Sequence, residues 1–305
     1  MENKTHSPQL IILAGATGDL GQRIARYLRQ NGADVRALVR SGSTSQEVLT
    51  RLREQGVDVV TVDFDNPTEL AEACRGGACV VSAVSGLREV IVDLQKRLLQ
   101  AALDAGVPRF IPSDYAIDYT KLSLGSNRNL DLRREFNEHL DKAPIAATSI
   151  LNGMFTDLLT GQAPVVLFPI RRVLYWGDAG KLLDFTTTDN TAEYTALAAL
   201  DPTTPRYLRI AGQVADVMDL KQAASSVTGK PFGLLRAGSL ATFGGLIKLT
   251  KTLAPGEGDV FPAWQGMQYM HNMFSGLPKL NPLDNNRYPG IRWTSVREVL
   301  ASRPQ

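Results

Sequence analysis

Three glycines near the start of the chain have the spacing of a phosphate-binding turn. The run Gly15-Ala-Thr-Gly18-Asp-Leu-Gly21 follows a short apolar segment and opens a segment of helical period. Gly15 permits a tight turn, Gly18 lets backbone approach a pyrophosphate, and Gly21 lets the helix pack closely on the strand. The helix start offers N–H groups and a positive dipole end to anions. The residues predicted to bind phosphate are Gly15, Thr17, Gly18, Asp19, Leu20 and Gly21.

A second diagnostic position follows the second apolar run, where a carboxylate would accept the ribose 2′-hydroxyl of NAD. The sequence there is Leu38-Val39-Arg40-Ser41, which has a cation and no acid. A guanidinium matches a 2′-phosphate in charge and in fork geometry. We therefore expect NADP(H) as the cofactor, with Arg40 at its 2′-phosphate. The alternative is that Arg40 is a solvated loop residue.

A polar, aromatic segment after the fifth apolar run offers groups for proton transfer. It contains Tyr115, Asp118, Tyr119 and Lys121. Lys121 would bias Tyr115 or Tyr119 toward the phenolate if it folded back against either ring, and otherwise it is a solvated lysine. A Tyr-x-x-x-Lys pair, in which lysine lowers the pKa of a catalytic tyrosine, occurs nowhere in the sequence. Its absence argues against a standard short-chain dehydrogenase and a sugar-nucleotide epimerase.

The elements that must position these residues alternate between two periodicities. Apolar strand-like runs alternate with amphipathic segments, of which the clearest is a helix predicted over 87–105 and ended by Gly106 and Pro108. Apolar strands separated by such helices predict a parallel sheet covered on both faces, a Rossmann-like doubly wound α/β domain. The predicted strands are 9–14, 33–39, 58–62, 78–84, 109–112 and 145–151.

The rest of the chain predicts a smaller C-terminal α+β region. We expect a hairpin over 173–185, a strand over 206–210, and helices over 192–200, 216–227, 240–253 and 295–300. Trp264, Met267, Met270, Met273 and Phe274 recur at near-helical spacing. This stripe either lines an apolar substrate pocket or packs in the core. We place an NADP-binding domain at residues 1–155 and an intertwined substrate or partner region at 156–305.

Composition bounds the remaining alternatives. The chain has 305 residues, 44% of them hydrophobic, and a formal net charge of +2, without a basic stripe for nucleic acid. Cys74 and Cys79 lack CxxC spacing and are expected to be reduced thiols, and His6, His139 and His271 lack the spacing of metal ligands. Residues 10–16 run directly into the glycine turn, so we do not interpret them as a signal peptide. No window reaches the roughly 18 apolar residues of a membrane helix. We expect a cytoplasmic protein without a nucleic-acid or membrane partner.

Five segments together resemble a known family. They are the glycine turn, Arg40, Val-Asp-Phe-Asp-Asn-Pro at 62–67, Phe-Ile-Pro-Ser-Asp-Tyr at 110–115, and Ser-Ile-Leu-Asn-Gly-Met-Phe at 149–155. This set resembles the NmrA-like and isoflavone-reductase-like group, which are atypical members of the short-chain dehydrogenase/reductase superfamily. The resemblance covers roughly residues 9–200. Its motifs are specific for fold and cofactor and much less so for the reaction.

The resemblance implies further site residues, all beyond the carboxyl ends of predicted strands, where ligands bind in such sheets. By this likeness, Asp63 and Phe64 border the adenine, Ser82, Ala83 and Val84 line the ribose and pyrophosphate, and Ser113 and Asn152 approach the nicotinamide. For Phe64 and Val84 the alternative is ordinary packing.

One departure from the family pattern bears on chemistry. Isoflavone-reductase-like enzymes carry a lysine on the helix before strand six, and the matching position here is Asn129. An amide can orient a substrate but does not shuttle a proton at neutral pH. The candidate catalytic residues are therefore Tyr115, Lys121 and, for substrate orientation, Asn129.

Three functions stay open. The first is an NADPH-dependent reductase acting on a small, fairly apolar, electron-poor substrate, because such an acceptor tolerates weak acid–base help. The second is a non-catalytic NADP(H) sensor with a regulatory protein partner, as the resemblance to NmrA-like proteins implies. A sugar-nucleotide epimerase or dehydratase ranks last because it requires the missing pair. Substrate, oligomeric state and pathway stay open.

Overall fold

The computed structural model describes residues 8–42 and 45–303, so His6 lies outside the described residues. Its contacts divide the chain into two units, each made of separate segments. The first comprises Met1–Asp114, Glu135–Ile150 and Thr191–Leu208, and the second Tyr115–Arg134, Leu151–Asn190 and Arg209–Gln305. The predicted division at residue 155 falls inside a continuous segment of the second unit.

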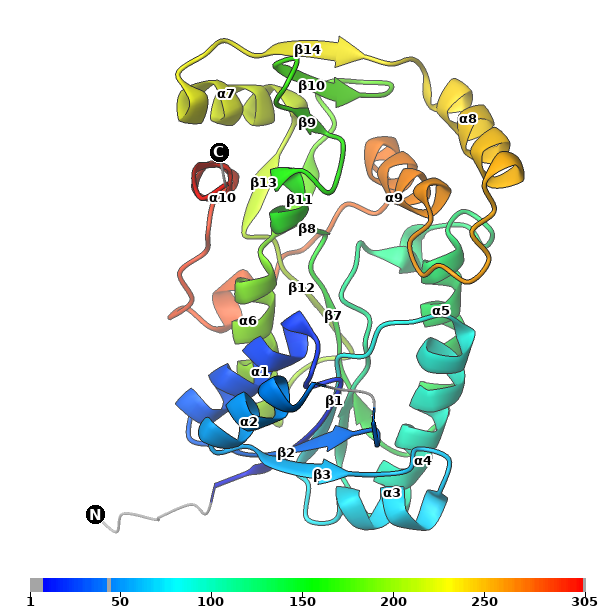
Figure 1. Ribbon diagram of the computed structural model, residues 1–305, viewed down its shortest axis with the longest axis vertical. Helices are drawn as coiled ribbons and strands as arrows, with labels where there is room; N and C mark the ends of the chain where they lie inside the picture. The colour runs from blue at the N-terminus through cyan, green and yellow to red at the C-terminus, as the bar shows by residue number, and fades with distance from the viewer. Residues whose placement is uncertain (1–7, 43–44, 304–305) are drawn as a thin grey trace. The chain divides into compact units, whose positions relative to one another are not determined.

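A six-stranded parallel sheet forms the centre of the first unit (Figure 1). Its strand order is β3-β2-β1-β4-β5-β6, which confirms the predicted Rossmann-like topology. The central strands are almost fully buried because helices cover both faces of the sheet. The strands are β1 (Leu10–Ala14), β2 (Asp34–Val39), β3 (Asp58–Thr61), β4 (Cys79–Ser82), β5 (Arg109–Ile111) and β6 (Ala146–Ala147).

Successive strand side chains point to opposite faces, and the two faces are covered by different helices. Ile12, Val80 and Phe110 pack with Leu70 of α3 and Leu98 of α4 in one core cluster. In Figure 1, α1 and α2 lie on the opposite side of the sheet from α3 and α4. The helices are α1 (Asp19–Gln30), α2 (Gln46–Glu54), α3 (Pro67–Cys74), α4 (Gln95–Asp104), α5 (Arg128–Leu140) and α6 (Thr188–Leu200).

The predicted helix over 87–105 is not uniform. Its first part, Glu89–Leu94, is a π-helix that continues directly into α4. The amide of Gln95 is buried at this junction, where its Nε2 donates to Ile91 O at 2.6 Å. Apolar periodicity placed the helix correctly but does not encode a widened turn, because both forms bury one face.

The predicted strand over 145–151 divides into β6 and β7 (Ser149–Leu151). β6 pairs with β5, whereas β7 forms a two-stranded sheet with β12 (Tyr207–Arg209). The change occurs at Thr148, whose N–H donates to Phe110 O at 3.0 Å. A continuous apolar run therefore serves two sheets.

The second unit contains two small three-stranded sheets and several helices. One sheet has the order β14-β10-β9 and the other β13-β11-β8. The strands are β8 (Met154–Phe155), β9 (Val166–Leu167), β10 (Arg172–Tyr175), β11 (Leu183–Thr186), β13 (Gln213–Ala215) and β14 (Gly233–Arg236). The helices are α7 (Val217–Thr228), α8 (Leu240–Leu253), α9 (Ala263–Ser275) and α10 (Val296–Ala301), with 3-10 turns at Tyr119–Lys121, Thr156–Thr160 and Asn285–Arg287.

The predicted hairpin over 173–185 is wrong. β10 pairs with β14 and β9, whereas β11 pairs with β13 and β8, so the two segments belong to different sheets. The glycine-containing loop does not reverse onto β10, because Gly177 N–H donates to Gly238 O at 2.9 Å. The turn composition was read correctly, but the strand pairing depends on residues about 30 to 60 positions away.

Candidate functional site

The glycine turn between β1 and α1 adopts a conformation that depends on two of its glycines. Gly15 has a φ of +83°, and a Cβ there would lie 2.5 Å from Ala83 O, at the end of β4. A Cβ on Gly21 would lie 2.0 Å from Gly15 O. Both glycines are therefore required by the fold itself, because the strand, turn and helix approach one another through bare backbone.

At position 18, in contrast, the fold itself does not require a glycine. Its φ is −76°, and a Cβ would meet only Gly15 O at an ordinary 3.6 Å. Gly18 is the N-cap of α1 and provides no side-chain cap for the first N–H groups of the helix. It is exposed, as is Asp19, whose carboxylate pairs with Arg23 at 3.0 Å. The turn thus leaves room for an external anion at the helix N-terminus.

The next predicted residues follow β2 and β3. Arg40 is exposed directly after β2. Asp63 is exposed after β3, and its carboxylate accepts the Asp65 N–H at 2.9 Å. Phe64 is only 7% exposed and belongs to the core cluster of the first unit. The ring packs in the core, as the alternative interpretation of Phe64 expected, and its contact with an adenine stays a prediction.

The ends of β4 and β5 are joined by side-chain hydrogen bonds. Ser113 Oγ donates to Val84 O at 2.6 Å, and Ser113 N–H donates to Gln95 Oε1 at 2.9 Å. Ser82 is fully buried, and its Oγ has no hydrogen-bond partner among the described residues. A buried hydroxyl without a partner is costly, and such groups often mark a site that a ligand or water completes. Ala83 is half-buried beside it, and its carbonyl oxygen is the atom that a Cβ on Gly15 would meet.

Sequence reasoning missed a buried polar network at Asp114, the residue that follows Ser113. Asp114 is fully buried, and both carboxylate oxygens accept from Asn137 Nδ2 at 3.1 and 3.0 Å. Asn137 Oδ1 accepts from Ser149 Oγ and from Arg206. Arg206 also pairs with Asp141 at 2.7 Å. The only available signal was the charge of Asp114 within an apolar context, since its partners lie far along the chain.

Within the second unit, the segment that begins at Tyr115 is joined to Asn152. Ala116 O accepts the N–H groups of Asn152 and Gly153 at 3.0 and 3.2 Å. Tyr115 is 7% exposed and Asn152 is fully buried. Gly153 has a φ of +69°, and a Cβ there would lie 2.3 Å from Asp184 O. The structure thus brings together two segments that the sequence predicted to serve one site.

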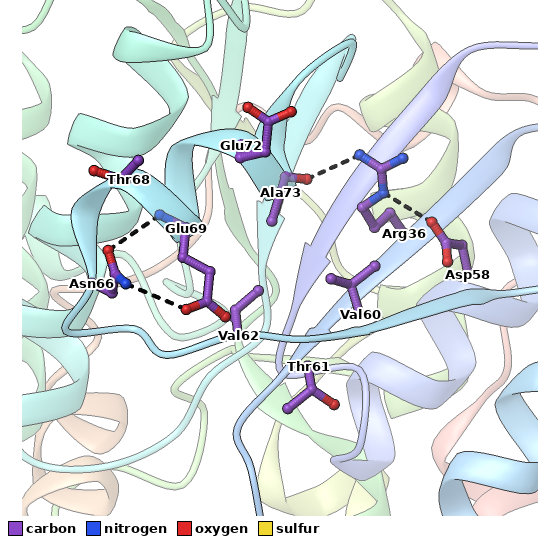
Figure 2. Close-up of a pocket in the computed structure, with 10 residues that line it drawn as sticks. All are labelled: Arg36, Asp58, Val60, Thr61, Val62, Asn66, Thr68, Glu69, Glu72 and Ala73. Carbon is purple, nitrogen blue, oxygen red and sulfur yellow. Dashed lines mark hydrogen bonds and ion pairs between the residues drawn. The ribbon is translucent and has the colours of Figure 1, made fainter.

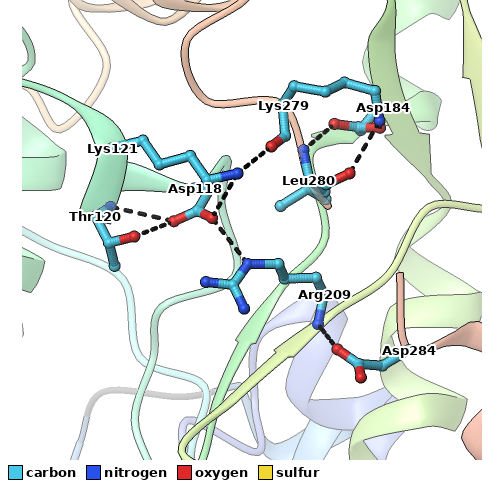
Figure 3. Close-up of polar contacts among 8 residues, drawn as sticks. All are labelled: Asp118, Thr120, Lys121, Asp184, Arg209, Lys279, Leu280 and Asp284. Atoms are coloured by element: carbon cyan, nitrogen blue, oxygen red, sulfur yellow. Dashed lines mark hydrogen bonds and ion pairs between the residues drawn. The ribbon is translucent and has the colours of Figure 1, made fainter. Parts of the chain in front are cut away.

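Lys121 belongs to a network of ion pairs (Figure 3). Its Nζ donates to Lys279 O at 2.6 Å and lies 3.5 Å from Asp118 Oδ2. Asp118 is fully buried and also pairs with Arg209 at 2.8 Å. Burial opposes the ionisation of Asp118, but hydrogen bonds from Thr120 and Arg209 outweigh it and hold its pKa below the usual range. These contacts favour a structural role for Lys121 over the predicted activation of a tyrosine.

The pKa of a second carboxylate in this network is shifted in the opposite direction. Asp184 of β11 pairs with Lys279 and accepts the Leu280 N–H at 2.8 Å. Burial raises the pKa of Asp184 despite these partners. The network fixes residues 279–284 to β11 and to Arg209, whose N–H donates to Asp284 Oδ2 at 2.8 Å.

The contacts of Asn129 favour a structural role over the predicted orientation of a substrate. Its Nδ2 donates to Val260 O at 2.9 Å, and its Oδ1 accepts from Arg128 Nε at 3.1 Å. The side chain is 1% exposed. The Nδ2 group therefore holds the loop before α9, and Oδ1 is hydrogen-bonded to the neighbouring Arg128 of α5.

Four of the five predicted stripe residues pack in the interior of the second unit, and Met267 is half-buried. Trp264, Met270, Met273 and Phe274 are each less than 8% exposed on α9. Phe274 packs against Trp176, with ring centroids 6.1 Å apart. This burial favours the core interpretation over a substrate pocket.

A groove of about 550 Å³ lies along the edge strand β3 and α3 (Figure 2). Its polar groups are largely satisfied, since Arg36 pairs with Asp58 at 2.9 Å and Asn66 bonds with Glu69. Val62 and Asn66 of its lining flank the predicted Asp63 and Phe64. The groove is lined by Arg36, Asp58, Val60, Thr61, Val62, Asn66, Thr68, Glu69, Glu72 and Ala73.

Other chemistry finds little support among the described residues. No group of three or more His, Cys, Asp or Glu side chains there is arranged for a metal ion. Burial raises the pKa of Cys74 and of Cys79 to about 12, so both free thiols are poor nucleophiles. Between residues 8 and 303, apart from 43–44, no helix is long and apolar enough to cross a bilayer.

The strand order and the glycine-lined first turn define a Rossmann-like α/β protein. The NmrA-like family model matches residues 7–237, and the chain belongs to this family. It is 28% identical over 245 residues to pinoresinol reductase 1 of Arabidopsis thaliana, covering 75% of this chain and 77% of that protein. It is 25% identical to bifunctional pinoresinol-lariciresinol reductase 2 of Thuja plicata, over 87% of this chain and 86% of that protein. The solved structure of AtPrR2 with NADP+ and (+)pinoresinol matches 97% of this chain and 99% of that chain, with a TM-score of 0.83 at 22% identity.

Proposed function

We propose that this protein is an NADPH-dependent oxidoreductase that reduces a small, fairly apolar, electron-poor substrate. The observation that carries the proposal is Gly18. Gly15 and Gly21 are explained by the fold, whereas Gly18 meets no close atom and leaves the start of α1 without a side-chain cap. A bound pyrophosphate explains both features, because it would accept hydrogen bonds from the exposed N–H groups.

The preference for NADP(H) over NAD(H) rests on Arg40. This exposed guanidinium follows β2, the strand whose end receives the adenosine ribose in Rossmann-like domains. Ser82, Ala83, Val84 and Asp63 would contact the nucleotide from the neighbouring strand ends. The similar structure of AtPrR2 supports this choice, since it was solved with NADP+.

The cofactor, when bound, supplies the hydride. The residues of this chain would bind the nucleotide, orient it and exclude water. Ser113 is held by Val84 and Gln95, and it would present its remaining acceptor capacity to the nicotinamide amide. By the family resemblance Asn152 would approach the nicotinamide, and Tyr115 is the proposed contact to the substrate.

Proton transfer receives little help from the residues that the family pattern would supply. Asn129 replaces the family lysine and its amide is committed to Val260 and Arg128. Lys121 is paired with Asp118. An electron-poor acceptor suits this arrangement, because it takes hydride without prior protonation.

A non-catalytic NADP(H) sensor is the second candidate, and the same committed Asn129 favours it. The two functions are separated by one pair of measurements. NADPH oxidation is followed by absorbance across quinones, enals and aromatic ketones, and the affinities for NADPH, NADP+ and NADH are measured by calorimetry. Turnover with any acceptor supports the oxidoreductase. No turnover, together with unequal affinities for NADPH and NADP+, supports the sensor, and no heat with any of these nucleotides contradicts both.

Two variants refine the assignment. Arg40→Ala is expected to lower NADPH affinity at least tenfold while NADH affinity changes little, because only NADPH carries the 2′-phosphate. Retained NADPH preference would remove Arg40 from the site.

Tyr115→Phe is expected to reduce kcat without changing NADPH affinity, and undiminished turnover would remove Tyr115 from the mechanism.

A further inference from the structure

Gln95 is a fully buried amide at the point where the π-helix Glu89–Leu94 continues into α4. Its neighbours Leu94 and Leu98 belong to the apolar core cluster of the first unit. Burying an amide in such surroundings is unfavourable unless its oxygen and its nitrogen both find hydrogen-bond partners. A methionine would fill similar space without this requirement, so the amide is present for its hydrogen bonds.

Both ends of this amide are hydrogen-bonded, and the partners fix its orientation. Nε2 donates to Ile91 O at 2.6 Å, and Oε1 accepts the Ser113 N–H at 2.9 Å. The backbone N–H of Gln95 donates to Val92 O, three residues earlier. Nε2 therefore gives Ile91 O the hydrogen bond that this N–H would make in an α-helix. One side chain thus completes the π-helix and reaches the segment after β5.

Ser113 lies just beyond the ladder that joins β4 to β5. The ladder ends at Ile111, and Pro112 has no N–H to extend it. Two side-chain hydrogen bonds continue the connection, since Gln95 Oε1 holds the Ser113 N–H and Ser113 Oγ donates to Val84 O at 2.6 Å. Because its proton is committed to Val84, the Ser113 hydroxyl can only accept a further hydrogen bond.

We propose that Gln95 is a positioning residue for the nicotinamide end of the cofactor and that it acts through Ser113. The inference rests on the proposed NADP(H) function. The carboxamide NH2 of nicotinamide is a donor, which matches a hydroxyl that is restricted to accepting. Loss of Gln95 Oε1 leaves the Ser113 N–H without its partner, so the position of Oγ is no longer fixed from the backbone side. The adenosine and pyrophosphate are proposed to contact Arg40 and the glycine turn, so their binding should not depend on Gln95.

Calorimetry with two nucleotides tests this role. NADPH is compared with 2′-phospho-ADP-ribose, which has the same phosphates and adenosine but lacks nicotinamide. Gln95→Met is expected to weaken NADPH binding about fivefold, the usual strength of one neutral hydrogen bond, and to leave the affinity for the nicotinamide-free nucleotide within about twofold. Ser113→Ala should give the same pattern. The double variant should bind NADPH no more weakly than Ser113→Ala, because both changes remove the same contact.

Three further variants separate this role from an effect on folding. Gln95→Glu keeps an oxygen that accepts from the Ser113 N–H in either protonation state, so it should retain most of the selectivity for NADPH over the nicotinamide-free nucleotide. Gln95→Asn, whose amide is one methylene shorter, replaces Gln95→Met if that variant does not fold, and the same selective loss is expected. Gln100→Met is the matched control, because Gln100 is an exposed glutamine of α4 that bonds to Asp104 at 2.7 Å. It should bind both nucleotides as the wild type does.

The outcomes distinguish this inference from the proposed function. If Gln95→Met weakens both nucleotides equally, or neither, the positioning role is overturned, while NADPH binding by the wild type still supports the proposed function. Additive losses in the double variant also overturn it, because Gln95 would then act by a route other than Ser113. A wild type that binds neither nucleotide contradicts the proposed function and this inference together.

Discussion

The Gly15–Gly21 turn is determined by close backbone contacts, within the turn and to Ala83, whereas the Tyr115–Asn129 segment is held by side chains and carbonyls from distant parts of the chain. In the turn, a Cβ on Gly21 would meet Gly15 O, six residues away. In the segment, Lys121 bonds to Lys279 and Asn129 to Val260. Close backbone contacts of this kind require glycine, so they can be recognised from the residue type, whereas distant partners cannot. The two regions therefore differ in how far a functional prediction from sequence can reach.

The largest expected effect is in the turn. Gly21→Ala places a methyl group 2.0 Å from a backbone oxygen that cannot move without displacing β1. We expect the free energy of unfolding to fall by about 3 kcal/mol or more, as for severe overpacking. Chemical denaturation measures it. A variant of native stability would show that the turn is not held by backbone contact.

The next effect lies in the distant-partner segment and depends on pH. Asp118→Asn removes the partner of Arg209, and breaking such a buried pair is expected to cost about 3 kcal/mol at neutral pH. Because the folded pKa of Asp118 is depressed, its contribution is present above the unfolded pKa of about 3.9 and is lost as pH falls through the folded value. The difference between wild type and variant should therefore shrink in acid. Glu47→Gln, in an exposed pair with Arg51, is the control and should change stability by less than about 0.5 kcal/mol.

Gly18→Ala sharpens the contrast inside the turn itself. The added Cβ has ordinary space, so stability should change by less than about 1 kcal/mol. NADPH affinity should fall at least tenfold, because the methyl group occupies the approach to the pyrophosphate. Calorimetry and thermal melts on one preparation separate these effects. Unchanged affinity would mean that the nucleotide does not approach Gly18.

The smallest expected effect separates structure from catalysis at Asn129. Asn129→Ala removes one of two donors to Val260 O, since Arg128 Nη2 also donates to it at 2.8 Å, and should cost about 1 kcal/mol of stability. Turnover by the folded fraction should stay within about twofold of wild type. A loss of kcat beyond tenfold at full folding would instead support the predicted substrate-orienting role of Asn129.

Much of the fold was predictable because its signals are periodic. The six strands of the main sheet and α8 follow from apolar patterns, and the helix predicted over 216–227 is α7, whose N-cap is Asp216. The hairpin over 173–185 failed because Gly177 bonds to Gly238 rather than across a turn. In the site, Gly15, Gly18 and Gly21 were found by spacing, whereas Asp114 was not, because its partners Asn137 and Arg206 come from other segments.

The hydrogen bonds of Ser113 have a consequence for how this protein can be altered. Ser113 Oγ holds Val84 O, and the π-helix starts at Glu89, so residues 85–88 form a short connection with both ends fixed by the first unit. Within this connection Gly86 and Arg88 are constrained, because a Cβ on Gly86 would lie 2.6 Å from Val90 Cβ and Arg88 pairs with Glu135. Ser85 is exposed, so it is the position in this connection where a new side chain can be introduced without disturbing either contact.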